Sequence, residues 1–159
     1  MRSNVLLRLT HVGKALLLVI VILLWSKSGI LYAASDSLPY KVYWLIKNRN
    51  FTPQKNQLVA IYEHDTKYVH DTRFIKIVGG VFGDRIKIIN EQMWINDHLV
   101  GKIRAHTNGD QPLTPINSQI IPAGWIFVYA THTDSFDSRY MEFGLVNVNK
   151  IIGKVKPLW

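Results

Sequence analysis

Residues 85–100 read RIKIINEQMWINDHLV, and this stretch carries two signals of β structure. Its first four residues alternate polar with apolar side chains, the period of two that a strand with one buried face requires. In its second half, apolar residues flank the polar pair Asn96-Asp97, a pattern typical of a β-hairpin with a tight turn. The stretch therefore predicts strands that pair through short turns.

Short runs of the same kind occupy the rest of the chain beyond Asp36. The 6 prolines fall between these runs or at their ends, where strands tolerate proline. We therefore expect residues 35–159 to form one all-β domain, in which residues 107–123 make the longest loop. The expected strands are Val42–Ile46, Leu58–Tyr62, Arg73–Val78, Arg85–Ile89, Met93–Ile95, Trp125–Ala130 and Val146–Ile152.

The N-terminal part of the chain is strongly apolar. From Ala15 to Trp25 every residue is apolar, and the stretch reaches Ala34 if the polar residues at 26–28 are tolerated. This longer span has the roughly 20 residues that cross a bilayer, with Lys27 placed to snorkel toward the headgroups. A cleavable signal peptide is the alternative, but cleavage after Ala34 would put Tyr32 where a small residue is needed. We expect residues 1–34 to be a basic cytoplasmic tail and an uncleaved signal anchor, a single transmembrane helix.

The charge distribution agrees with that topology. The formal net charge is +8, and Arg2, Arg8 and Lys14 precede the apolar stretch while no acidic residue occurs before Asp36. Basic residues before an anchor favour a cytoplasmic N-terminus, with the rest of the chain outside. No recognisable nucleic-acid-binding motif accompanies the charge, so we expect no nucleic-acid partner. The absence of cysteine excludes disulfides, thiolate catalysis and cysteine-based zinc sites.

One lysine and one serine have sequence surroundings suited to catalysis. A serine hydroxyl becomes a good nucleophile when a base takes its proton, and a lysine amine serves as that base only when it is neutral. Lys76 lies in an apolar run, and on a strand Phe74 and Val78 would share its face and desolvate it. A strand lysine that points to solvent is the alternative. Ser37 lies three residues past the end of the apolar span at Ala34, close to the expected membrane surface.

Three motifs in order resemble those of the type I signal peptidases, peptidase family S26, and within them the conjugative-transfer maturation peptidases of the TraF type. Ser37-Leu38-Pro39-Tyr40 is similar to the nucleophile motif of that family. The stretch from Lys76 through Gly79-Gly80 to Gly83-Asp84 is similar to its lysine motif, and Ser135-Phe136-Asp137-Ser138-Arg139-Tyr140 to its late motif. The resemblance implies a signal-peptidase-like β-rich catalytic domain.

The resemblance also implies a role for each site residue. Ser37 corresponds to the nucleophile and Lys76 to the general base of a Ser/Lys dyad. Ser35 corresponds to a hydroxyl that joins the Ser37 backbone N–H in the oxyanion hole. Ser135 corresponds to a serine that orients the lysine amine. Asp137 and Arg139 correspond to a supporting ion pair, and no cofactor or metal is expected.

Two positions depart from the motifs of the conjugative group. Lys41 stands where a glycine usually follows the proline of the nucleophile motif, and Thr131-His132-Thr133 replaces a Gly-Asp-Asn sequence before the late motif. The segment between Asp84 and Thr131 is too short for the second domain of larger leader peptidases. A reduced cap around the Trp94 hairpin is expected instead.

The expected function is that of a membrane-anchored serine endopeptidase on the periplasmic face of a bacterial inner membrane. The expected partners are the lipid bilayer and a membrane-inserted precursor protein, a conjugative pilin in the first instance. Hydrolysis and acyl transfer leading to cyclisation both stay open. The alternatives are a non-catalytic, membrane-anchored β module that assists assembly of a conjugation or secretion apparatus, and a nucleic-acid-binding protein of a transfer system.

Overall fold

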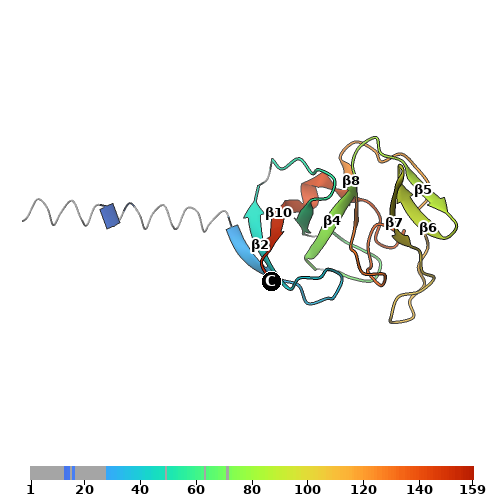
Figure 1. Cartoon of the computed structure of the whole chain (residues 1–159), viewed down its shortest axis with the longest axis horizontal. Coiled ribbons are helices and arrows are strands. Elements are labelled where there is room, and N and C mark those ends of the chain that lie inside the picture. The colour runs from blue at the N-terminus through green and yellow to red at the C-terminus, as the bar shows by residue number, and fades with distance from the viewer. Residues whose placement is uncertain (1–12, 15, 17–27, 49, 63, 71) are drawn as a thin grey trace, which may run out of the picture.

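A computed structural model describes residues 13–14, 16, 28–48, 50–62, 64–70 and 72–159, and the regular secondary structure of these residues is almost entirely β-strand (Figure 1). Seven strands form a sheet in the order β1-β2-β10-β3-β4-β8-β9, and three form a second sheet in the order β5-β6-β7. All the pairings are antiparallel. The all-β prediction is confirmed. The strands are β1 (Ser28–Tyr32), β2 (Val42–Lys47), β3 (Leu58–Ile61), β4 (Phe74–Gly80), β5 (Ile86–Ile89), β6 (Gln92–Ile95), β7 (His98–Lys102), β8 (Trp125–Tyr129), β9 (Val146–Asn147) and β10 (Ile151–Pro157).

The prediction of a transmembrane helix up to residue 34 is wrong at the end of that segment. Residues 28–34 were expected to continue a transmembrane helix, but Ser28–Tyr32 form β1, which pairs with β2 from Ser28↔Ile46 to Tyr32↔Val42. Apolar composition alone does not separate a strand from a helix, and here the ladder to β2 decides. Most of the expected anchor, including residues 17–27, lies outside the described residues. Among the residues that are described, no helix is long and apolar enough to span a bilayer.

The hairpin in residues 85–100 forms as predicted. Strands β6 and β7 pair directly at Ile95↔His98, and Asn96 adopts a left-handed φ of 54° in the turn between them. Strand β5 adds the third strand on the other side of β6. In Figure 1 this small sheet lies at the end of the molecule away from β2.

The C-terminal run was predicted as one strand, Val146–Ile152, and this prediction is wrong. Strand β9 ends at Asn147, whose side chain accepts a hydrogen bond from the Asn149 N–H and begins a short 3-10 helix, η1 (Val148–Lys150). Strand β10 then runs between β2 and β3. It passes so close to β2 that a Cβ at Gly153 would lie 2.1 Å from the Ile46 carbonyl oxygen.

Three groups of buried side chains form the core, and the third joins the two sheets. One includes Val59, Val78, Ile126 and Phe143 around strands β3, β4 and β8. The second includes Leu38, Tyr43, Ala60 and Ala130, and it anchors the loop after β1. The third lies under the small sheet and joins it to β8. The members of the third group are Ile86, Met93, Ile95, Ile116, Ile121 and Phe127.

Candidate active site

The first part of the site is the loop between β1 and β2, which carries Ser35 and Ser37. Leu38 is 6% exposed and packs into the core beside Tyr43, so it fixes the loop at the residue next to Ser37. The Ser37 carbonyl accepts a hydrogen bond from the His132 N–H at 3.2 Å, which ties the loop to the segment after β8. The hydroxyl oxygens of Ser35 and Ser37 lie 3.0 Å apart. The structure therefore brings the two predicted serines together.

Lys41, one of the departures from the motif, also contacts this loop. Its amine donates to the Ser35 carbonyl oxygen at 3.3 Å and forms an ion pair with the Asp36 carboxylate. The hydrogen bond and the positive charge lower the pKa of Asp36. Lys41 thus links two residues of the loop, Ser35 and Asp36, by polar contacts.

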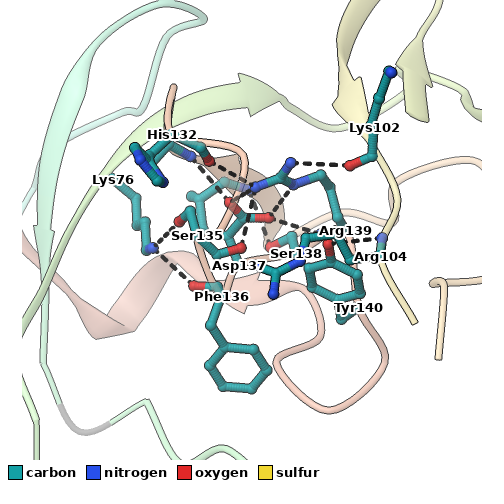
Figure 2. A network of polar contacts seen from close by, with 12 residues as sticks. Lys76, Lys102, Arg104, His132, Ser135, Phe136, Asp137, Ser138, Arg139 and Tyr140 are labelled. Atoms are coloured by element: carbon teal, nitrogen blue, oxygen red, sulfur yellow. Dashed lines mark hydrogen bonds and ion pairs between the residues drawn. The ribbon is translucent and has the colours of Figure 1, made fainter. Parts of the chain in front are cut away.

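Lys76 lies in the middle of β4 and points into the protein. Its side chain is 4% exposed, and the alternating burial of the strand puts it on the same face as buried Val78. The alternative of a solvent-facing strand lysine is therefore wrong. The amine donates to the Ser135 hydroxyl at 2.7 Å and to the Phe136 carbonyl at 2.8 Å, as Figure 2 shows. The centroid of the Phe143 ring lies 5.8 Å from the Lys76 Nζ.

Burial changes the acid–base chemistry of this amine. Desolvation lowers the pKa of Lys76 from 10.5 to about 8, with Asp137 opposing the change and Arg139 adding to it. With a pKa of about 8, roughly one amine in ten is neutral at pH 7, against roughly one in three thousand for an ordinary lysine. Burial therefore gives Lys76 a neutral amine that is available as a base near neutral pH.

The late motif forms a buried polar network behind the lysine. The Arg139 guanidinium makes two parallel hydrogen bonds to the Asp137 carboxylate, Nε to Oδ1 at 2.8 Å and Nη2 to Oδ2 at 2.9 Å. Asp137 is 0% exposed and Arg139 is 2% exposed. Asp137 also accepts from the Ala130 N–H at the end of β8. The predicted ion pair is present, and its bidentate geometry is the strong form of this contact.

Arg139 connects the site to both sheets. Its Nη2 donates to the carbonyl oxygen of Ser135 at 3.1 Å, the same residue whose hydroxyl accepts from Lys76. Its Nη1 donates to the Lys102 carbonyl at 3.1 Å, at the end of β7 in the small sheet (Figure 2). The arginine thus holds the late motif between the two sheets.

Sequence reasoning missed several contributors to this network. Ser138 is 0% exposed, accepts from the Val128 N–H and donates to the Gly144 carbonyl, so it fixes the late motif to β8. The Phe136 carbonyl and the Phe143 ring complete the surroundings of the lysine amine. Ser138 lies inside the motif that was identified, so its position was the available signal. The other two contacts depend on tertiary packing.

A cleft of about 550 Å³ brings Ser35, Ser37 and Lys76 into one lining. The cleft is lined by residues 30–35, 37 and 38 of β1 and the loop after it, and by residues 69, 72–76 and 136. Ser135 lies behind the lysine amine, and the Asp137–Arg139 pair is in the core beyond it. Among the described residues, no three His, Asp or Glu side chains are grouped to hold a metal ion.

An all-β domain that places a serine hydroxyl and a desolvated lysine amine in one cleft has the groups of the serine–lysine class of hydrolases. The family model described as "Signal peptidase, peptidase S26" matches residues 4–159, and the chain belongs to that family.

Two known proteins illustrate the similarity. A signal peptidase I of Bacillus caldolyticus is 32% identical over 94 residues, which cover 52% of this chain and 50% of that protein. The chain thus matches about half the length of this curated relative. A crystal structure of a signal peptidase I from Enterococcus faecalis V583 aligns with a TM-score of 0.46 and 22% identity. That alignment covers 65% of this chain and 97% of the other.

Proposed function

We propose that this protein is a serine endopeptidase in which Ser37 is the nucleophile and Lys76 the general base. The observation that carries the proposal is the lysine amine, which is buried, has a pKa of about 8 and lines the same cleft as Ser37. Membership of the signal peptidase family supports the assignment.

Each step of the proposed reaction uses a group of the cleft. The neutral Lys76 amine takes the proton of the Ser37 hydroxyl, and the serine oxygen attacks the scissile carbonyl carbon. The negative oxygen that develops is placed near the Ser37 N–H and the Ser35 hydroxyl, whose oxygen lies 3.0 Å from that of Ser37. When the carbon–nitrogen bond breaks, the leaving amine receives the proton from Lys76, and an ester to Ser37 remains.

The second half of the reaction regenerates the enzyme. Lys76 takes a proton from a water molecule, whose oxygen attacks the ester and releases a carboxylic acid while Ser37 recovers its proton. If the amino terminus of the substrate attacks in place of water, the product is a cyclic peptide. In both versions Ser135 keeps the lysine amine in place, and the Asp137–Arg139 pair fixes the segment that carries Ser135.

The substrate proposal is a precursor protein presented at the membrane, a conjugative pilin in the TraF-type version. The apolar stretch Ala15–Trp25 provides the core of the proposed single-pass anchor, with residues 35–159 as the periplasmic catalytic domain. Exposed apolar side chains support membrane proximity: Tyr32 and Tyr40 flank the nucleophile loop, and Trp159 is 86% exposed. The Trp159 carbonyl accepts from the N–H of residue 42, which puts the C-terminus beside the start of β2 (Figure 1).

The test is cleavage of a candidate precursor by the full chain in detergent, with the products identified by mass spectrometry. Ser37→Ala and Lys76→Ala are expected to abolish processing, whereas the exposed control variants Ser118→Ala and Lys156→Ala retain it. Mass spectrometry also distinguishes a linear product from a ring, because ring closure lacks the mass of one water. Undiminished processing by either cleft variant would exclude the dyad. Absence of processing by the wild type across pilin and other exported precursors would favour the non-catalytic β module.

A further inference from the structure

The cleft has an unbalanced charge. Among the residues that line it, Arg73 and Lys76 are the only basic ones. The lining contains no aspartate and no glutamate. Lys76 is buried and has its own partners, but Arg73 is exposed to solvent. The proposed reaction gives Arg73 no role. Arg73 is therefore a charged residue in the lining of the cleft that chemistry at Ser37 leaves unused.

One aromatic contact orients the Arg73 side chain. Its guanidinium carbon lies 5.3 Å from the centroid of the Tyr62 ring, a cation–π contact that leaves the N–H edges available for a carboxylate. Among the described residues no acidic side chain pairs with it. Two carboxylates of the described residues have other partners: Asp36 pairs with Lys41, and Asp65 pairs with His70.

Arg73 also has a defined place along the cleft. It precedes β4 and stands three residues before Lys76, a distance of about 10 Å in an extended chain. A substrate held in extended form would cover the same distance with about three residues. A side chain that meets Arg73 would thus lie about three residues from the bond that Ser37 attacks.

We propose that Arg73 selects precursors that carry an aspartate or glutamate about three residues from the scissile bond. This inference rests on the proposed peptidase function and adds an acidic position to its substrate class. A guanidinium on an aromatic ring offers paired N–H donors that match a carboxylate in geometry and charge. An anionic lipid headgroup is the other chemistry that Arg73 could bind. The peptide is favoured because Arg73 shares a cleft with Ser37 and Lys76.

The test separates binding from cleavage. Full-length Ser37→Ala protein in neutral detergent is titrated with fluorescent, alanine-rich peptides that carry Glu, Gln or Lys at one position in turn on each side of a central Ala-Ala bond. At one position, about three residues from that bond, the Glu peptide is expected to bind about fivefold more tightly than the Gln peptide, the ratio expected of one partly exposed ion pair. The preference is expected to weaken in 0.5 M salt.

Charge variants at residue 73, made in the same Ser37→Ala background, identify the source of that preference. Arg73→Gln is expected to bring the ratio of Glu to Gln affinity close to one, and Arg73→Glu to make the Lys peptide the preferred one. Arg85→Gln, which removes an exposed arginine outside the cleft, is the matched control and is expected to keep the fivefold ratio. Cleavage of the same peptides by the Ser37 protein tests the peptidase function separately.

Three results would overturn the inference. The first is equal binding of the Glu and Gln peptides at every position, and the second is a Glu preference that survives in Arg73→Gln. The third is a loss of binding to phosphatidylglycerol vesicles in Arg73→Gln with unchanged peptide ratios, which would assign the guanidinium to lipid. Failure of cleavage with the Glu preference intact would instead contradict the peptidase proposal and leave Arg73 as a peptide-binding residue.

Discussion

Replacing Lys76 with methionine is expected to make the free energy of unfolding less dependent on pH. The folded state lowers the pKa of Lys76 from 10.5 to about 8, so the unfolded chain binds more protons between these values. The free energy of unfolding therefore rises with pH between about 8 and 10.5. Below pH 8 the burial of the Lys76 charge lowers it by its full amount. The full reduction is about 3 kcal/mol, from 1.36 kcal/mol for each pKa unit, and about 2.5 kcal/mol of it should be recovered between pH 7 and pH 10.

The assay is urea unfolding of the full chain in detergent, followed by tryptophan fluorescence at pH 7 and pH 10. Methionine also leaves the Ser135 hydroxyl and the Phe136 carbonyl without their donor, but this cost does not depend on pH across the window. The free energy of unfolding of wild type relative to Lys76→Met should therefore increase by about 2.5 kcal/mol from pH 7 to pH 10. Lys156→Met, at an exposed position, controls for the loss of a positive charge. A constant difference between wild type and Lys76→Met would refute the reasoning.

Three further substitutions test the parts of the site around the lysine. Asp137→Ala should reduce the free energy of unfolding by about 3 to 5 kcal/mol, because it leaves the Arg139 guanidinium buried without its carboxylate; urea titration would show this, and a loss below 1 kcal/mol would contradict it. Ser35→Ala should lower kcat about a hundredfold with little change in KM, as expected for a donor to the oxyanion, and an equal kcat in steady-state cleavage would remove Ser35 from that role. Leu38→Ala should destabilise the fold by about 2 to 4 kcal/mol and also lower kcat, because Leu38 anchors the loop of Ser37; an unchanged kcat at a temperature where the variant is folded would separate the anchor from the site.

Much of the fold was predictable because the strands of both sheets carry local signals. The alternation in residues 85–88 and the polar pair Asn96-Asp97 correspond to β5 and to the turn of the β6–β7 hairpin. Strand β1 was missed because its apolar residues continue an apolar run, and only the ladder to β2 shows that they are extended. The break between β9 and β10 depends on the Asn147 cap, a contact that apolar periodicity does not report.

The candidate site shows the same division between local pattern and tertiary packing. The order of the serine, lysine and late motifs indicated which side chains to consider, and the structure places Ser35, Ser37 and Lys76 in one cleft. The burial of Lys76 was only suggested by Phe74 and Val78, since the side chains that complete it come from residues 135–143. Arg73 belongs to no recognised motif, and only its place in the lining of the cleft draws attention to it.

The pH dependence of acyl-enzyme formation tests the central claim, that a neutral Lys76 amine activates Ser37. A single-turnover experiment with the full chain in detergent would follow the mass of the Ser37 ester from pH 6 to pH 9.5. The rate is expected to rise about tenfold per pH unit at the acidic end and to level off above an apparent pKa of about 8. A rate that is independent of pH over this range, or an ester that forms equally fast in Lys76→Ala, would contradict the account.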